Sequence, residues 1–418
     1  MSPGTAEIQG AVARYIELGL ALGRHVDGLV DAYYGPPDLA ARMSAEPVRA
    51  PERLVSEARA LLAALDTGVP LDDPNVAHGP QSASGHRSDA DPGRRRWLRA
   101  QVFGLLTTAR RLSGEDISYA DEVESCYGVR PRPIEWDQVA EAHKRLEAAV
   151  PGSGPLDERL IAWREAHAVP PEKLLGAISS LAEDLKERTE RLFGLPDGEI
   201  CEFELVTDKP WSGFNTYLGD LRSRVDVNTD LPVLSLSLPH LVAHESYPGH
   251  HTEHTAKEVG LVRRRHWLEE TIFLVGTPQC LLAEGLADLG LRVVMGPRPE
   301  PVAAKHFASL GIRYDADAAA EIADASVVLQ AVRATAAWRL HQEGVDPETV
   351  VSELARWALL PRARAEKSVE FLLHPTWRAY ITCYVEGYEL CRGFVDDDPT
   401  RFSRLLNEQL VPADLVHP

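Results

Sequence analysis

Pro248 and Gly249 interrupt a histidine-rich segment, and they constrain how this part of the chain can fold. The segment reads His244-Glu245-Ser246-Tyr247-Pro248-Gly249-His250-His251. In an unbroken helix, His250 would stand about 240° around the axis from His244, and His251 would lie about 10.5 Å further along it. Proline removes a backbone donor and clashes with the preceding turn, while glycine tolerates unusual dihedral angles. We therefore expect a bulge or break that brings two of the histidines together.

The same segment is similar to a stretched zinc-peptidase motif. In the standard His-Glu-x-x-His form, two histidines four positions apart bind one Zn²⁺, and the adjacent glutamate acts as the base toward the water bound to the ion. Pro248 stands where the second histidine would be, so two residues must be looped out to restore a chelating pair. Several helical zinc peptidases end their motif with Gly-His, which favours His250 as the second ligand. His251 is the alternative ligand, or a residue that supports a ligand or orients the substrate.

A third protein ligand is needed for a catalytic zinc site, and the helical stretch from Leu281 to Asp288 offers one. Glu284 is flanked by apolar residues, where an unpaired carboxylate would be costly to bury and a metal-bound one is compensated. Asp288 follows one turn later, and its carboxylate could accept the free ring N–H of a histidine ligand and fix its tautomer.

Apolar residues recur at helical spacing through most of the 418 residues, so we expect a mainly α fold. The clearest predicted helices cover 5–34, 51–66, 93–113, 134–150, 171–193, 264–294, 315–344, 347–358 and 376–394. From Thr67 to Gly93 the sequence lacks apolar periodicity, which predicts a mobile surface loop containing His78 and His86. We expect an N-terminal helical region, 1–195, and a metal-site region, 196–418, within one compact unit.

A small β-sheet is expected shortly before the histidine-rich segment. Alternating apolar residues predict strands over 200–206, 224–228 and 233–236, while 208–217 has the composition of a substrate-binding loop or a structural turn. An edge strand at this position could hold an extended peptide beside the metal. A purely structural hairpin is equally consistent with the pattern.

Charge and cysteine content restrict the partners and the compartment. A formal net charge of −19 is unfavourable for binding nucleic acid or anionic membranes, because phosphate binding requires clustered lysine and arginine. The five scattered cysteines are typical of buried thiols in a reducing compartment. No apolar run approaches the ~18 residues of a membrane span, so we expect a cytoplasmic protein. The sequence does not indicate an oligomeric state.

The combination of His-Glu-x-x-Pro-Gly-His-His with an alanine-flanked Glu-Gly some forty positions later resembles the family called domain of unknown function 885. That family is regarded as zinc peptidases of the glutamate-zincin type. The resemblance covers the motifs between about residues 205 and 394. It implies a multi-helix zincin-like fold, Zn²⁺ held by His244, His250 and Glu284, and Glu245 as the general base. Leu286 departs from the family, which commonly has an aromatic residue there.

The expected reaction is hydrolysis of a peptide bond in a short peptide, of the carboxypeptidase or oligopeptidase type, by Glu245-assisted attack of zinc-bound water. Tyr384 is the best candidate to stabilise the tetrahedral oxygen, with Tyr380 and Arg378 behind it, although helical spacing equally predicts a packing role for Tyr384. Arg222 and Arg224 could hold a substrate carboxylate, or could pair with Asp220 or Asp226. Two alternatives are a zinc amidohydrolase acting on a non-peptide metabolite and a non-catalytic helical scaffold.

Overall fold

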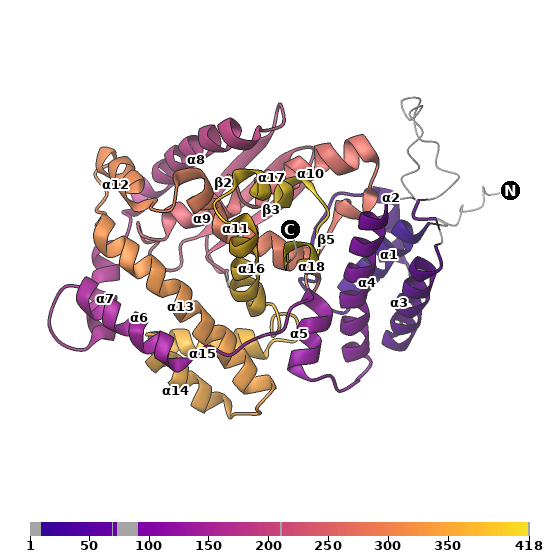
Figure 1. The fold of residues 1–418 in the computed structure, drawn as a ribbon, viewed down its shortest axis with the longest axis horizontal. Coiled ribbons are helices and arrows are strands. Elements are labelled where there is room, and N and C mark those ends of the chain that lie inside the picture. Colours follow the sequence, from indigo (N-terminus) through magenta and orange to yellow (C-terminus); the bar gives the residue numbers. More distant parts are fainter. Residues whose placement is uncertain (1–9, 69, 73–90, 210, 417–418) are drawn as a thin grey trace.

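The computed structural model describes residues 10–68, 70–72, 91–209 and 211–416. It is mostly helical with two small sheets, so the prediction of a mainly α protein is confirmed (Figure 1). Most of the expected loop 67–93, with His78 and His86, lies outside the described residues. Within the described residues, no helix is both long enough and apolar enough to cross a bilayer.

The first elements form a helical bundle with its own core. They are α1 (Ala11–Gly23), β1 (Val30–Tyr33), α2 (Pro37–Ala45), α3 (Pro51–Asp66) and α4 (Pro92–Leu112). Proline occupies the first turn of α2, α3 and α4, where its missing N–H costs no helical hydrogen bond. Tyr15 of α1 and Trp97 of α4 meet edge to face in the core between these helices.

Four more helices lead into a three-stranded sheet. The helices are α5 (Tyr119–Tyr127), α6 (Trp136–Ala149), α7 (Leu156–Ala166) and α8 (Pro171–Phe193), and the strands are β2 (Ile200–Val206), β3 (Gly213–Gly219) and β4 (Arg222–Asn228). The strand order is β2-β4-β3, with β2 parallel and β3 antiparallel to β4. Strand β3 is therefore at the edge of the sheet, where it contacts β1 and the two helices that follow the sheet.

Helix α11 (Pro278–Met295) lies centrally in the rest of the molecule, where elements from both ends of the chain contact it (Figure 1). This helix is buried along most of its length, as expected for a helix that is apolar on nearly all sides. A Cβ atom on Gly285 would lie 2.3 Å from the carbonyl oxygen of Gly387, so glycine is needed for this close approach. The elements before α11 are α9 (Leu238–Glu245), α10 (His250–Lys257), the π-helix η2 (Glu258–Arg263), the 3-10 helix η3 (Leu268–Thr271) and β5 (Ile272–Leu274). Those after it are α12 (Glu300–Ser309), α13 (Ala316–His341), α14 (Pro347–Trp357), α15 (Arg362–Leu373), the π-helix η4 (Cys383–Gly387), α16 (Tyr388–Val395), α17 (Pro399–Asn407) and α18 (Pro412–Val416).

The prediction of one long helix over 5–34 is wrong. Helix α1 ends at Gly23, and the chain turns through Gly28, at φ 74°, into β1. This strand pairs antiparallel with β5, far away in the sequence, and Asp31 is the extra residue in a register shift between Val30 and Ala32. Local periodicity carries no signal for such a distant partner.

Three other predicted elements are also corrected. The helix over 264–294 is broken by His266, at φ 60°, and by η3 and β5, so that α11 begins only at Pro278. The helix over 376–394 starts later, as η4 followed by α16. Residues 233–236 do not form a strand and make only an isolated bridge from Leu234 to Ala168, whereas the expected loop 208–217 contains the start of β3.

A buried carboxylate in η3 makes the stability of the fold depend on pH. Glu270 accepts hydrogen bonds from Gln409 Nε2 at 2.8 Å and from Gln279 Nε2 at 3.1 Å. Burial raises the pKa of Glu270 from 4.5 to about 7. Because the folded state holds the proton more tightly than the unfolded state, Glu270 costs stability increasingly as the pH rises from about 4.5 to about 7.

We therefore expect Glu270→Gln to gain stability relative to the wild type by up to about 3 kcal/mol between pH 4.5 and pH 8. The side-chain oxygens of Gln279 and Gln409 are buried without partners, so rotated amides could accept the new N–H groups. Denaturant unfolding of both proteins at the two pH values measures the difference. Glu190→Gln, on the exposed side of α8, is the matched control. A constant difference between Glu270→Gln and wild type would contradict the prediction.

Candidate metal centre

The helix break expected at Pro248 and Gly249 is present. Helix α9 ends at Glu245 and α10 begins at His250, with a short non-helical link between them. A Cβ atom on Gly249 would lie 1.9 Å from the carbonyl oxygen of His244, so no other residue fits this link unless the backbone moves. The link therefore lets the end of α9 and the start of α10 approach each other closely.

Three side chains converge at this point from α9, α10 and α11. His244 Nε2 lies 3.1 Å from His250 Nε2 and 3.4 Å from Glu284 Oε2, and His250 Nε2 lies 3.5 Å from Glu284 Oε1. Ligand atoms 2.0–2.1 Å from one tetrahedral ion are separated by about 3.3–3.4 Å. The three potential ligands thus have the spacing of a tetrahedral site with one position left open.

The donor set also suits a zinc ion chemically. Two imidazoles and one carboxylate are a common ligand combination for catalytic zinc. Glu284 Oε2 is buried and has no hydrogen-bond partner, which would be costly unless a cation lies beside it. Burial alone would raise the pKa of Glu284, but the neighbouring His250 and His244 lower it well below its usual value. The two imidazoles therefore favour the ionised carboxylate, which is the form that binds a metal.

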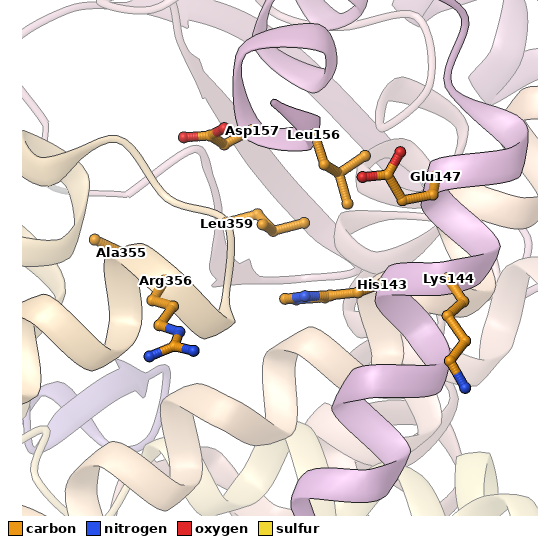
Figure 2. A pocket seen from close by; sticks show the side chains of 8 residues that line it. All are labelled: His143, Lys144, Glu147, Leu156, Asp157, Ala355, Arg356 and Leu359. Atoms are coloured by element: carbon orange, nitrogen blue, oxygen red, sulfur yellow. The ribbon is translucent and has the colours of Figure 1, made fainter. Parts of the chain in front are cut away.

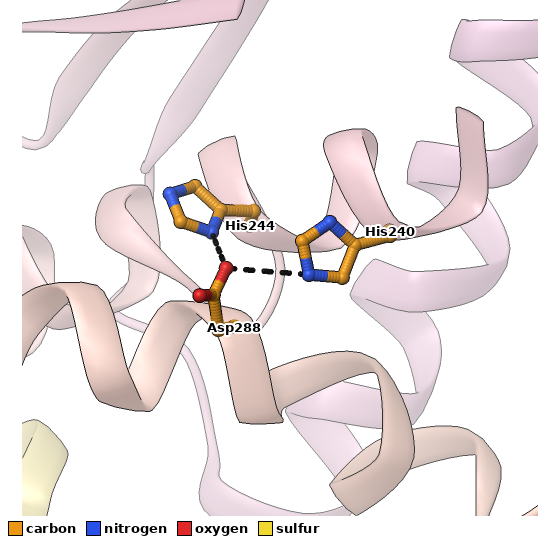
Figure 3. Close-up of side chains that lie close together, drawn as sticks. All are labelled: His240, His244 and Asp288. Atoms are coloured by element: carbon orange, nitrogen blue, oxygen red, sulfur yellow. Dashed lines mark hydrogen bonds and ion pairs between the residues drawn. The ribbon is translucent and has the colours of Figure 1, made fainter. Parts of the chain in front are cut away.

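Asp288 lies between His244 and His240 (Figure 3), and it contacts His244 at Nδ1, the ring nitrogen that does not face His250. Its Oδ1 lies 2.8 Å from His244 Nδ1 and 3.3 Å from His240 Nε2. This arrangement places the proton of His244 on Nδ1 and leaves Nε2 directed toward His250 and Glu284. His240, His244 and Asp288 form a second group with ligand-like spacing among the described residues. In this group His240 is exposed, and Asp288 Oδ1 contacts both histidines. The more deeply buried group, His244, His250 and Glu284, is the better candidate.

Glu245 lies between the ligands and the edge of the sheet. Its carboxylate comes so near to β3 that a Cβ atom on Gly213 would lie 3.2 Å from Glu245 Oε1. Asn215 Nδ2 of the same strand donates to the backbone oxygen of Glu245 at 2.6 Å. Burial raises the pKa of Glu245, which brings this carboxylate closer to the range of a general base working near neutral pH.

His251 does not lie with His244 and His250. It is fully buried, with Nε2 at 2.6 Å from Glu199 Oε2 and Nδ1 at 2.8 Å from Ser223 Oγ. Glu199 also accepts hydrogen bonds from Tyr247 and Lys186. Burial alone would raise the pKa of Glu199, but these donors lower it to about 2. Both ring nitrogens of His251 are engaged, so neither is free for a metal or a substrate in this structure.

Two tyrosines line the side of the centre that faces η4. Tyr380 donates to Glu284 Oε1 at 2.8 Å, and Tyr384 donates to the hydroxyl of Tyr380 at 3.5 Å. Burial raises the pKa of both phenols, so both remain hydrogen-bond donors. Arg378, considered as a cationic donor, instead forms an ion pair with Glu122 at 2.6 Å.

Asp31 is a site residue that the sequence did not reveal. It lies in the irregular part of β1, close enough to the centre for its charge to interact with His250, Glu284 and Glu245. Burial raises the pKa of Asp31 to about 7. Irregular strand positions often aim a side chain into a site. The sequence predicts a helix over 5–34, which assigns Asp31 no place near the histidines, and no local motif marks this residue.

A hollow of 380 Å³ is lined by a different set of residues (Figure 2). It is bounded by side chains of α6, α7 and α14, including His143, Glu147 and Arg356. His143 Nε2 is bonded to the backbone oxygen of Trp357. None of the predicted site residues lines this hollow, so we place the candidate centre at His244, His250 and Glu284.

Comparison with known proteins gives information on the fold alone. No protein-family model matches the chain, and no curated protein matches it. A solved structure described as a "putative lipoprotein" from Colwellia psychrerythraea is similar over 88% of this chain and 68% of its own, with 15% identity and a TM-score of 0.50. A "putative lipoprotein of unknown function" from Shewanella oneidensis aligns over 98% of this chain and 82% of its own, with 12% identity and a TM-score of 0.48.

Proposed function

We propose that this chain is a zinc-dependent hydrolase that cleaves peptide bonds of short peptides. The observation that carries the proposal is the convergence of His244, His250 and Glu284, with the buried and unpartnered Glu284 Oε2 among them. Glu245 lies next to the first ligand in the chain and has a raised pKa, as a general base requires. The motif resemblance supports membership of the domain of unknown function 885 family and a zincin-like arrangement of helices.

His244, His250 and Glu284 would hold the zinc ion, with Asp288 fixing the tautomer of His244. A zinc ion in such a site activates water and polarises a carbonyl group. Glu245 would take a proton from the attacking water and pass it to the leaving amine. Tyr380 and Tyr384 are protonated donors on the η4 side, where Tyr384 would stabilise the oxygen that gains negative charge.

The position of β3 supports an extended substrate. An edge strand has backbone N–H and C=O groups free to pair with another extended chain. Strand β3 passes Glu245 at Gly213, where the missing side chain leaves room for close approach. A peptide paired with this edge would run directly past the proposed base, which favours a peptide over a compact metabolite as the substrate.

The test is to incubate zinc-loaded protein with a mixed library of short peptides and to identify the products by mass spectrometry. We expect cleavage that stops when zinc is removed by a chelator and returns when zinc is added. Parallel libraries with blocked N-termini and with amidated C-termini show from which end the enzyme works. Cleavage of non-peptide amides alone would indicate an amidohydrolase instead. Protein that binds no zinc and cleaves nothing would indicate a non-catalytic scaffold and overturn the proposal.

A further inference from the structure

His240, His244 and Asp288 (the outer group) lie at Nδ1 of His244, whereas the candidate centre lies at Nε2 of the same ring (Figure 3). His240 and His244 stand four positions apart on α9, so their side chains share one face of the helix. Asp288 of α11 meets both rings, with Oδ1 at 3.3 Å from His240 Nε2 and 2.8 Å from His244 Nδ1. Two histidines at this helical spacing, facing a carboxylate, can bind one divalent ion.

The spacing within the outer group is close to that around a bound ion. Its three potential ligand atoms all lie within 4.8 Å of one another. Ligand atoms of one tetrahedral zinc ion are about 3.3–3.4 Å apart, and the distance of 3.3 Å between His240 Nε2 and Asp288 Oδ1 already matches this. The distance of 2.8 Å between His244 Nδ1 and Asp288 Oδ1 is that of a hydrogen bond. It would lengthen by about half an ångström when an ion replaces the proton.

An ion can reach the outer group from solvent. The side chain of His240 is 49% exposed, whereas those of His244 and Asp288 are only 11% and 12% exposed. The carboxylate of Asp288 and the formal net charge of −19 both favour a cation. Binding must displace the Nδ1 proton of His244 together with its hydrogen bond to Asp288, which weakens it relative to the centre. We therefore expect the outer group to fill only after the centre is filled.

The outer group and the centre share His244, so they cannot be filled independently. When His244 binds the centre through Nε2, Asp288 holds the proton on Nδ1 and fixes the orientation of the ring. An ion on the outer side would take Nδ1 and end this support. It would also place a second divalent cation on the same ring, where the two positive charges repel each other. Filling the outer group should therefore disturb the first ligand of the centre.

We propose that the outer group is a second metal site, through which excess zinc inhibits the enzyme. The inhibition rests on the proposed function, whereas the binding requires only His240, His244 and Asp288. Loss of the partner that orients a histidine ligand typically costs roughly 10- to 100-fold in metal affinity or activity. We therefore expect kcat/KM to fall by about 10- to 100-fold when the outer group is filled.

The experiment titrates zinc-loaded wild type, His240→Ala and His374→Ala with free zinc up to about 1 mM, the range of weak binding. Equilibrium dialysis counts the ions per chain, and peptide hydrolysis is measured on the same samples. We expect wild type to take up a second ion and to lose activity over the same range of zinc concentration. His240→Ala should hold one ion, keep the basal activity and lose the sensitivity to excess zinc. His374, an exposed histidine at the end of α15, gives the matched control, which should behave as wild type.

The outcomes separate this inference from the proposed function. A second ion in both wild type and His240→Ala, or none in wild type, would overturn it. A second ion that leaves hydrolysis unchanged would also overturn it. If wild type cleaves no peptide, the proposed function fails, and ion counting in His250→Ala, which lacks a ligand of the centre, still tests the outer group. Weak binding by His250→Ala that disappears in His240→Ala/His250→Ala would support the outer group, and equal binding by these two variants would overturn it.

Discussion

Glu245→Gln should reduce kcat by about 10³-fold while zinc content stays unchanged. Glutamine keeps the size of the side chain beside Gly213 but cannot accept the proton of the attacking water. Because Glu245 is not among the three converging ligand atoms, the metal should remain bound. Single-turnover rates with a library-derived peptide, together with metal analysis of the same preparation, measure both quantities.

Glu190→Gln removes a carboxylate from an exposed helix face and should change neither the rate nor the zinc content. Full activity in zinc-loaded Glu245→Gln would show that another group takes the proton. Asp31 would then be the first residue to replace, because it is a carboxylate with a pKa raised to about 7 in the field of the same centre.

His250→Ala and His251→Ala should have opposite effects although the residues are adjacent. His250→Ala removes one of three converging ligand atoms, so tight zinc binding and activity should be lost. His251→Ala should keep zinc at one ion per chain but unfold at lower temperature, because Glu199 and Ser223 would lose a buried hydrogen-bond partner. We expect a loss of about 2–4 kcal/mol for His251→Ala.

Zinc stoichiometry after dialysis and thermal unfolding of the metal-free proteins distinguish the two variants. Measuring stability without metal is essential, because bound zinc would itself stabilise the wild type. Tight zinc binding by His250→Ala would overturn the assignment of the second ligand. Replacement of both histidines should combine the two effects.

The sequence predicts correctly those helices whose start and length are set by local residues. Helix α8 covers 171–193 and α3 covers 51–66, as expected, because both begin with proline and continue with uninterrupted apolar periodicity. The errors arose where a distant partner decides the conformation. Residues 30–33 have apolar positions compatible with a helix, yet they form β1 because β5 offers a strand to pair with. His266, at φ 60°, ends a helix without any proline or glycine to indicate it.

Some residues of the candidate site could likewise be predicted from local sequence, and others could not. His244, Glu245 and His250 are close in sequence, so a local motif identifies them as candidates. The spacing from Glu284 to Asp288 is also local and can be recognised in the same way. The motif could not decide between His250 and His251, because the choice depends on Glu199 and Ser223 drawing His251 toward the sheet. Asp31 belongs to a strand that reaches the centre only through tertiary packing, and it does not stand in a recognisable pattern.

The pairing of β1 with β5 also bears on whether the chain can be split. Asp31 and its strand come from the region before residue 195, whereas β5, α9 and α11 come from the region after it. A polypeptide starting at residue 196 would leave one side of β5 without its partner and one wall of the centre missing. Two fragments divided at this point should regain hydrolysis only after they reassociate. Genetic complementation by the two fragments would therefore measure whether β1 and β5 can pair between separate chains.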